Sequence, residues 1–280
     1  MTSEAVLSRT TKAAASPDFV FWAAALVLAG LVVLASVAPI LPMPSYSAMS
    51  TARLASPNPA HWFGTDQFGR DLLVRVLFGL RTSLWIGALG VTASTVLGTA
   101  VGLIAGYTGG WLDTVCMRAL DSLLAFPSLL LAIGVAAILG PGAVSTALAL
   151  GIVGVPQMAR IVRAGTLSES QMQYVEAARS VGTKTGSILL RHILPNVLHL
   201  ISVQMVMFFV VAVLTEASLS FLGLGIQVPV PSLGSMLKEA RDYVGTAPWF
   251  VVAPGAALTL SVLALNIFAD GLRTHAGSRS

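Results

Sequence analysis

Long apolar stretches alternate with shorter polar segments along most of this sequence. A helix needs about 20 residues to cross a hydrocarbon core about 30 Å thick. Six stretches are long enough: 19–41, 84–106, 120–139, 143–163, 197–222 and 248–270. The pattern predicts an all-α, polytopic membrane protein with six transmembrane helices.

The polar segments set the expected organisation of the chain. We predict two tails that flank one transmembrane domain, an external segment after the first helix, and a core of five helices with one long polar loop. Their ranges are 1–18 and 272–280 for the tails, 19–271 for the domain, 42–83 for the external segment, 84–271 for the core and 164–196 for the loop.

The external segment begins with prolines and ends with an amphipathic pattern. Pro42, Pro44, Pro57 and Pro59 predict an extended chain. Over residues 66–81, leucine and valine recur at helical spacing while charged residues take the other faces. We expect a helix there that either lies in the outer headgroup layer or packs on the outer ends of the spans.

The second and third spans carry further signals. A face of small residues allows another helix to approach closely, either as generic packing or as a subunit contact; it comprises Gly87, Gly90, Gly98, Gly102 and Gly106. Arg118 and Asp121, three residues apart, are expected to face one another on a helix. Phe126-Pro127 predicts a bend within the third span.

Composition supports a membrane protein and removes several classes of function. Of the 280 residues, 55% are hydrophobic and 10% are charged, with a mean hydropathy of +0.84, whereas soluble domains are about 25% charged. The basic residues behind the net charge of +4 lie between the spans without interleaved aromatics, so nucleic acid is not an expected partner. The single cysteine, Cys116, precludes an intrachain disulfide, and the four histidines lack metal-ligand spacing.

Basic residues also predict the orientation. With the N-terminus inside, cytoplasmic segments hold ten of the 16 lysines and arginines, and the other six lie in longer outer loops, where the positive-inside rule is weaker. We therefore expect both termini and the loop over 164–196 in the cytoplasm. A signal peptide cleaved near residues 35–38 is the alternative for the N-terminus. The first apolar run is too long for that, so an uncleaved first helix is preferred.

The polar loop carries signals for the start and end of a helix. Thr166 with Glu169, or Ser168 with Gln171, would cap a helix that begins near residue 167 or 169. Gly182 is placed to end this helix, because glycine takes a left-handed conformation without steric cost.

A second short helix is expected to start from Thr183 or Thr185, and Pro195 suits the first turn of the fifth span. Together the two short helices would form an elbow over residues 169–195, held at both ends by spans. Such an elbow is able to enter a groove on a cytoplasmic partner. The periodicity alone favours a loop packed on its own protein.

Residue spacing in this loop matches a known signature. Glu176-Ala177-Ala178 is followed after three residues by Gly182 and after nine more by His192-Ile193-Leu194-Pro195. This resembles the EAA loop in the permease subunits of ABC importers, which forms coupling helices on the ATP-binding subunit. Four other segments resemble the C-type permeases of dipeptide, oligopeptide and nickel importers: FGTDQFGRDLLVRVLFGLRTSL (63–84), EASLSFLGLGIQVPVPSLGSML (216–237), APWFVVAPG (247–255) and NIFADGLR (266–273).

Two departures from the family pattern put peripheral contacts in doubt. Leu233 stands where this branch usually has tryptophan, and the tail after Arg273 lacks the usual acidic, proline-containing ending.

The resemblance implies a permease subunit of the bacterial inner membrane that imports di- or oligopeptides, with nickel or another small solute as the alternative. It implies a second permease subunit, one or two ATP-binding subunits that carry ATP and Mg, an extracytoplasmic substrate-binding protein and contact with membrane lipid. It also implies seven residues that couple this chain to the ATPase: Glu176, Ala177, Ala178, Gly182, His192, Leu194 and Pro195.

No catalytic, nucleotide or metal site is expected in this chain. A phosphate-binding loop needs a lysine after a glycine, and Lys12, Lys184 and Lys238 do not follow one. An ion-driven secondary transporter, the main alternative, would carry inverted repeats and paired intramembrane charges. A membrane enzyme would carry clustered catalytic groups. Neither pattern is evident.

Polar residues within the spans are candidates for the translocation pathway. Glu216, in the fifth span, should face protein or water because a carboxylate is costly in lipid. It is either a gate or cavity residue or part of an ion pair with the partner permease. Ser218, Ser220 and Asn266 are able to line the route, although bonding between helices is the commoner role.

Overall fold

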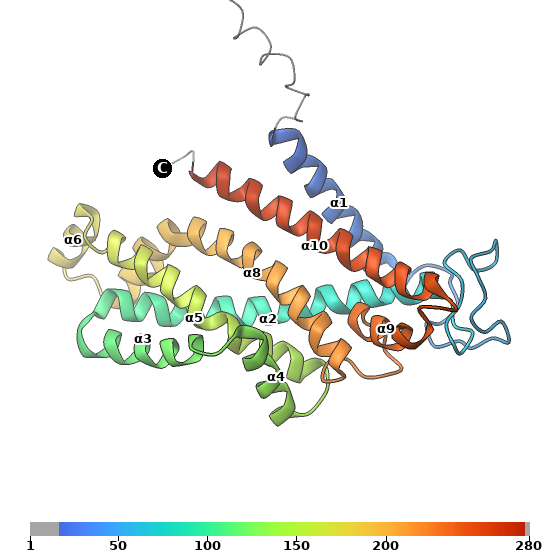
Figure 1. Cartoon of the computed structure of the whole chain (residues 1–280). Helices are drawn as coiled ribbons and strands as arrows, with labels where there is room; N and C mark the ends of the chain where they lie inside the picture. Colours follow the sequence, from blue (N-terminus) through green and yellow to red (C-terminus); the bar gives the residue numbers. More distant parts are fainter. Residues whose placement is uncertain (1–16, 278–280) are drawn as a thin grey trace, which may run out of the picture.

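The computed structural model describes residues 17–277, which form a bundle of helices without extended strands in that range (Figure 1). Most of the expected N-terminal tail and the end of the C-terminal tail lie outside the described residues. The helices are α1 (Pro17–Val37), α2 (Leu72–Thr108), α3 (Gly110–Leu124), α4 (Ser128–Leu139), α5 (Ala143–Glu169), α6 (Gln173–Ser180), α7 (Thr185–Ser187), the π-helix η1 (Ile188–Ile193), α8 (Leu194–Leu222), α9 (Leu233–Ala240), the 3₁₀-helix η2 (Arg241–Tyr243) and α10 (Pro248–Gly277).

Five of the described helices are long and apolar enough to cross a membrane: α1, α2, α5, α8 together with its lead-in from Thr185, and α10. The pair α3–α4 is a sixth candidate if it counts as one span. The expected all-helical, multi-span architecture is confirmed, while a count of six crossings stays a prediction.

The expected separate helix over residues 66–81 is wrong, because α2 runs without a break from Leu72 to Thr108. At 1.5 Å per residue its 37 residues extend about 56 Å, well beyond the hydrocarbon thickness. Asp71 caps its start by accepting a hydrogen bond from the Val74 N–H at 3.1 Å. The apolar residues of its first turns pack on α9 and α10 in one buried cluster rather than on headgroups: Leu72, Val76, Leu80, Leu233, Met236 and Phe250.

The bend predicted within the third span is sharper than a kink, because α3 and α4 meet at an angle of 91°. The break falls at residues 125–127, and Pro127 precedes the first residue of α4. Proline has no N–H to continue the helical bonding, so the predicted bend becomes a full break. Only Gly109 separates the end of α2 from the start of α3 at Gly110.

Glycines of α2 let α5 approach closely, so the face of small residues serves mainly a contact within the chain. A Cβ added at Gly98 would lie 2.7 Å from the Met158 Cβ, and one at Gly102 would lie 2.7 Å from the Ala159 carbonyl oxygen. No side chain larger than hydrogen fits at these two positions. Gly90 and Gly106 also face α5, whereas Gly87 faces Phe209 of α8.

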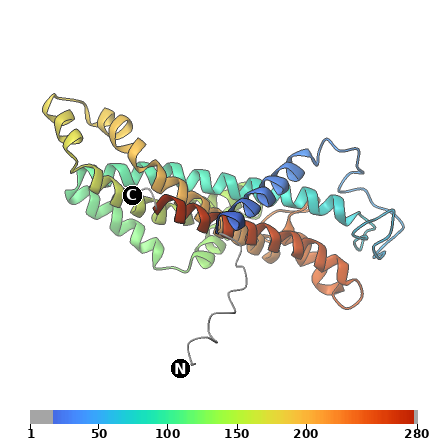
Figure 2. The ribbon, with the colours of Figure 1, turned by 90° about the horizontal axis from the view of Figure 1, so that it is seen from above.

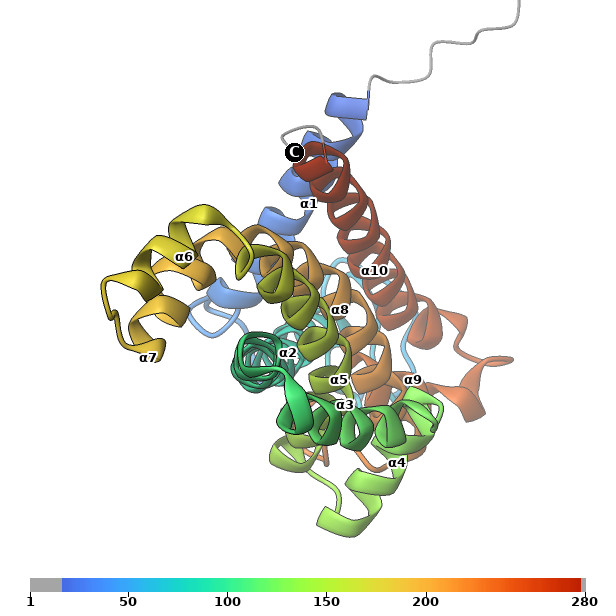
Figure 3. The ribbon, with the colours of Figure 1, turned by 90° about the vertical axis from the view of Figure 1, so that its left-hand side faces the viewer.

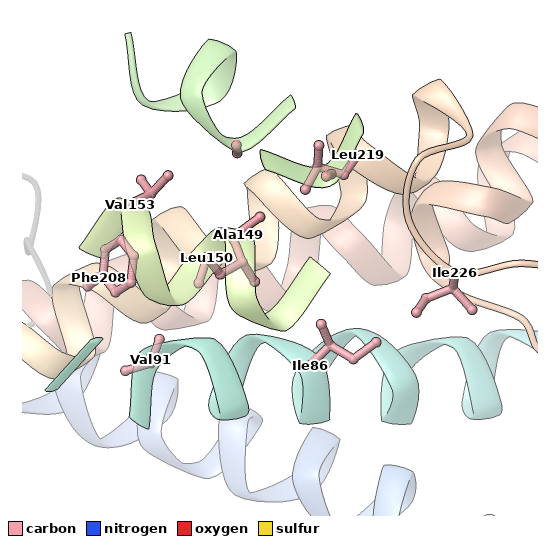
Figure 4. Packing of buried hydrophobic residues seen from close by; sticks show 11 residues of the cluster. Ile86, Val91, Ala149, Leu150, Val153, Phe208, Leu219 and Ile226 are labelled. Carbon is pink, nitrogen blue, oxygen red and sulfur yellow. The ribbon is translucent and has the colours of Figure 1, made fainter. Parts of the chain in front are cut away.

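The central core lies where α2, α4, α5 and α8 meet. Val91 of α2, Leu150 of α5 and Phe208 of α8 are buried there (Figure 4). Phe208 occupies the space that Gly154 leaves open, since a Cβ at Gly154 would lie 2.3 Å from the ring.

The two ends of the bundle differ. Residues 42–71 and α9 lie at one end, and α6 projects at the opposite end (Figures 1 and 2). The expected lack of regular structure after the prolines is confirmed, since residues 42–71 form turns with two isolated bridges. Helices α1 and α10 run side by side along the outside of the bundle (Figure 1).

Candidate functional site

The elbow over residues 169–195 projects from one end of the bundle (Figure 3). Its first helix, α6, covers Gln173–Ser180 and follows a break after Glu169, the last residue of α5. The expected caps at Thr166 and Ser168 are therefore wrong, since both residues lie inside α5. Met172 occupies the N-cap position without a side-chain bond.

Gly182 ends α6 as the sequence predicts. Its φ is +76°, in the left-handed region that favours glycine. Thr183 N–H donates to the Ala178 carbonyl at 3.0 Å, and Gly182 N–H donates to the Arg179 carbonyl at 2.9 Å. This pair of bonds is the Schellman motif, which satisfies the last carbonyl groups of a helix.

One face of α6 anchors the elbow in the bundle. Val175 and Ala178 are buried in a cluster with residues of α2, α5, η1 and α8. Glu176 and Ala177, on the other face, are exposed. The Glu176 carboxylate makes no ion pair within the part of the chain that the structure describes. Helix α6 therefore exposes the carboxylate of Glu176 and the small side chain of Ala177, while its opposite face is packed in the bundle.

Tyr174 connects both ends of the elbow. Its hydroxyl donates to Glu169 at the end of α5 and accepts a hydrogen bond from Asn196 Nδ2 of α8 at 3.0 Å. Asn196 also donates to the His192 carbonyl at 2.6 Å. Partial burial and the hydrogen bond to the Glu169 carboxylate raise the pKa of Tyr174 to about 12. The tyrosine therefore keeps its proton and this bond at neutral pH.

Arg179 ties α6 to the end of α2. Its guanidinium lies 4.6 Å from the centre of the Tyr107 ring, and its Nε donates to the Tyr107 hydroxyl at 3.1 Å. An arginine over an aromatic face is attracted by the ring quadrupole. The elbow is thus joined to α2 as well as to α5 and α8.

The second half of the elbow runs into α8 without a gap. The short helix α7 begins at Thr185, one of the two predicted starts. It continues through the π-helix η1 into α8, where Pro195 stands in the first turn as expected. Ile188 and Ile193 of η1 are buried. A push on the elbow would therefore reach α8 along one continuous backbone.

The predicted coupling residues divide by exposure. Glu176, Ala177, Gly182 and Pro195 are exposed. His192 and Leu194 are half-buried, and Ala178 is buried. All seven lie in this one elbow. Sequence reasoning missed Tyr174 and Arg179 as bonding residues.

Glu216 lies at the opposite end of α8, fully buried between helices. Ser220 Oγ donates to its Oε1 at 2.8 Å. The hydroxyl groups of Ser83 and Ser232 also face the carboxyl group, but Oε2 has no well-aligned hydrogen bond within the described residues. In this conformation the carboxyl group has no exposed surface through which to reach a partner permease.

The serines around Glu216 hold the start of α9. Ser232 forms a capping box with Ser235, the two side chains bonding each other's backbone N–H groups. Leu233 N–H donates to Ser83 Oγ of α2 at 3.3 Å. Leu233, which departs from the family's usual tryptophan, is fully buried here.

The end of α9 is held by a buried ionic cluster that the sequence did not reveal. Glu239 accepts hydrogen bonds from Arg70 at 2.8 Å and from Arg75 at 3.0 Å. Asp66 lies 2.5 Å from Arg70 Nε and 3.5 Å from Arg75 Nε. Arg75 is fully buried, and its Nη1 lacks a hydrogen bond within the described residues. Two acids and two arginines thus balance one another at the end of the bundle that holds α9.

The remaining pathway candidates bond locally. Ser218 donates to the Leu214 carbonyl and Asn266 donates to the Val262 carbonyl, each within its own helix. Ser218 is half-buried and Asn266 is exposed. The structure does not bring these two side chains into one site with Glu216 and Ser220.

Comparison with known proteins places this architecture among transport proteins. The family described as binding-protein-dependent transport system inner membrane component matches residues 98–279. The dipeptide transport system permease protein DppC of Alkalihalophilus pseudofirmus is 44% identical over 249 residues, 89% of this chain and 82% of that protein. The glutathione transport system permease protein GsiD of Pectobacterium atrosepticum is 46% identical over 217 residues, 78% of this chain and 72% of that protein.

A solved structure shares the fold. The MetNI methionine ABC transporter in inward-facing conformations superposes with a TM-score of 0.57 at 20% identity, over 72% of this chain and 95% of that chain. At this identity the likeness concerns the fold alone.

Proposed function

The chain belongs to the family of binding-protein-dependent transport system inner membrane components, and we propose that it is the permease subunit of an ATP-binding-cassette importer of di- or oligopeptides. It forms half of a translocation pathway in the bacterial inner membrane. The relatives named for dipeptide and glutathione transport support the peptide class. Nickel or another small solute is the alternative cargo.

The elbow is the observation that carries this proposal. Its exposed Glu176 and Ala177 stand opposite a face anchored by Val175 and Ala178. A helix held in this way can lie in a groove on another protein and transmit force. Glu176, Ala177, Ala178, Gly182, His192, Leu194 and Pro195 form or support the surface that docks on an ATP-binding subunit.

Movement of the elbow reaches the spans directly. Closure of two ATP-binding subunits would displace α6, which bonds Glu169 of α5 and Asn196 of α8 through Tyr174. Because packed helices move as rigid bodies, α5 and α8 would tilt together and expose the pathway to one side of the membrane at a time. ATP hydrolysis with Mg takes place on those subunits, and this chain supplies no catalytic group.

The proposal sets the remaining partners and the topology. A second permease subunit completes the pathway, one or two chains supply the ATP-binding subunits, and an extracytoplasmic protein delivers the substrate. The elbow and both termini face the cytoplasm, and α9 with residues 42–71 faces outward. Glu216 then positions the start of α9 at the outer mouth through Ser232, the N-cap of α9, and Ser83, which accepts a hydrogen bond from Leu233 N–H.

Reconstitution tests the function. The complete complex in proteoliposomes, with its binding protein outside and ATP inside, is expected to accumulate labelled dialanine. Glu176→Gln should reduce ATP-driven uptake about tenfold or more, as loss of a charge-assisted contact of about 1.5–3 kcal/mol predicts. Asp242→Asn, which removes an exposed acid from the outer loop, is the matched control and should leave uptake unchanged.

Two outcomes would reject the proposal. The first is uptake that follows an ion gradient and ignores ATP, which would indicate a secondary transporter. The second is full uptake in Glu176→Gln with normal assembly, which would remove the elbow from the mechanism. Uptake of a nickel chelate but not of dialanine would reject the peptide class alone.

A further inference from the structure

A hollow between α3 and α5 gathers five charged side chains. It has a volume of about 450 Å³ and is lined by Asp113, Thr114, Met117, Arg118, Asp121, Arg160 and Arg163. Its size lies within the range of small-molecule sites. The elbow and the outer loop contribute no residue to it.

Both acidic residues of the hollow, Asp113 and Asp121, form ion pairs. Arg163 binds Asp113 through two parallel hydrogen bonds, and Arg160 Nη2 binds Asp121 at 2.5 Å. The expected pairing of Arg118 with Asp121 is therefore wrong, because Asp121 is held by Arg160 across the helix contact. Arg118 is exposed and has no ion pair within the described part of the chain. One positive charge is left without a counter-charge.

The charged lining of the hollow suits water better than lipid. Arg160 lies 17 residues after the start of α5 at Ala143, which is about 26 Å along the helix axis and close to the far edge of a core about 30 Å thick. The side chain of Asp121 is 50% exposed and is paired with Arg160. Charged groups at this depth face protein or water.

We propose that this hollow is a subsite near the cytoplasmic end of the translocation route, and that Arg118 binds the carboxylate end of a passing peptide there. The inference rests on the proposed function and names a residue that contacts the substrate. An arginine fork matches a carboxylate with two parallel hydrogen bonds. Because the hollow is open to water, binding is weak and release to the cytoplasm is fast, as conduction through a pathway requires.

Thiol labelling tests this subsite without ATP. In the complete complex in phosphatidylcholine nanodiscs, Cys116→Ser removes the native thiol and Thr114→Cys places one on the wall of the hollow. A water-soluble maleimide is expected to label this cysteine, with the product read by mass spectrometry on this chain. At about ten times its dissociation constant, dialanine should slow labelling about tenfold, whereas its C-terminal amide should not.

Matched variants identify the binding group. Arg118→Gln should weaken the affinity for dialanine about tenfold or more, as the loss of a charged hydrogen bond predicts. The same dialanine concentration should then slow labelling only about twofold or less. Arg81→Gln removes another exposed arginine without an ion pair among the described residues; it should leave the protection unchanged.

Several results would overturn the subsite. They are absence of labelling, equal protection by dialanine and its amide, and protection that survives Arg118→Gln. Protection by added anionic phospholipid in place of dialanine would show that Arg118 binds a lipid phosphate, and dissociation of the second permease in Arg118→Gln would show a subunit contact. The uptake experiment is separate, so uptake of dialanine without protection would reject the subsite and leave the importer standing.

Discussion

The guanidinium of Arg179 lies 4.6 Å from the centre of the Tyr107 ring and bonds its hydroxyl. These residues are 72 positions apart in sequence, and they join the elbow to the end of α2. The elbow therefore contacts three long helices of the bundle. A force that enters through α6 would act on all three at once.

Removing this contact should loosen coupling. Arg179→Ala loses a cation–π contact and a hydrogen bond, together worth about 1–2 kcal/mol. We expect more ATP hydrolysed per peptide imported, with normal assembly, measured by parallel hydrolysis and uptake assays. Arg191→Ala, another exposed arginine of the elbow without an ion pair among the described residues, should keep the wild-type ratio. An unchanged ratio in Arg179→Ala would show that this contact does not transmit force.

The conformation of Gly182 predicts a strong effect of a small substitution. The space around its Cβ position is open, but its φ of +76° is strained for any other residue, at about 1–2 kcal/mol. Gly182→Ala should already impair coupling and speed hydrogen exchange in α6, and Gly182→Trp should do the same. Gly186→Ala, also in open space but without positive φ, is the control and should exchange as wild type. Full uptake in Gly182→Trp would contradict the role of this turn.

The ionic cluster of Asp66, Arg70, Arg75 and Glu239 should contribute strongly to stability. Arg75→Ala leaves Glu239 short of a partner, and breaking a buried pair costs about 3–5 kcal/mol. The thermal unfolding temperature of the purified complex should fall clearly. The exposed pair Arg241–Asp242 offers the control, because Arg241→Ala should change stability by at most about 1 kcal/mol. Equal Tm values for Arg75→Ala and Arg241→Ala would show that the cluster does not stabilise the position of α9.

Two variants of Glu216 distinguish a role in positioning α9 from a role in the translocation pathway. Glu216→Gln keeps an oxygen that can accept the Ser220 hydrogen bond, so assembly, α9 packing and uptake should be retained. Glu216→Ala leaves the serines unpaired, at about 1–3 kcal/mol, and should raise proteolysis in residues 223–232. Loss of uptake in Glu216→Gln with intact α9 packing would instead place the charge in the pathway.

Tyr174 makes the elbow insensitive to pH across the neutral range. Its pKa of about 12 in the folded chain exceeds the unfolded value of about 10. Its proton therefore stabilises docking fully below about pH 10, and that contribution is lost as pH rises through the folded pKa. A spin label at Ser180→Cys should show constant mobility from about pH 6 to 9 and greater mobility above about pH 10. In Tyr174→Phe, the mobility of the spin label should no longer rise above about pH 10. A change in mobility centred near neutral pH would show that another group, and not Tyr174, controls the elbow.

Local signals in the sequence predicted several features well. Apolar length identified the spans that α1, α2, α5, α8 and α10 now form. The conformational freedom of glycine identified the end of α6 at Gly182, and the missing N–H of proline identified the first turn of α8. Each of these depends on a residue and its nearest neighbours along the chain.

Helix boundaries and long-range pairs were less predictable. The separate helix over 66–81 was wrong because α2 contains no proline and continues through Arg81 to Thr108, with glycines packed closely against α5 and α8. The caps at Thr166 and Ser168 were wrong because α5 gains more from packing its last turns than from ending early. Neither outcome follows from a short window of residues.

By itself, the amino-acid sequence determined the apolar segments, the turn at Gly182 and the family resemblance, because these depend on local composition, backbone conformation and spacing. Only the tertiary structure decided that Asp121 binds Arg160, 39 residues away, and that Arg75 binds Glu239, 164 residues away. The partner of a charged side chain is set by which helices pack together and at what rotation. That packing is a property of the whole bundle, and it also leaves Arg118 without an acidic partner among residues 17–277.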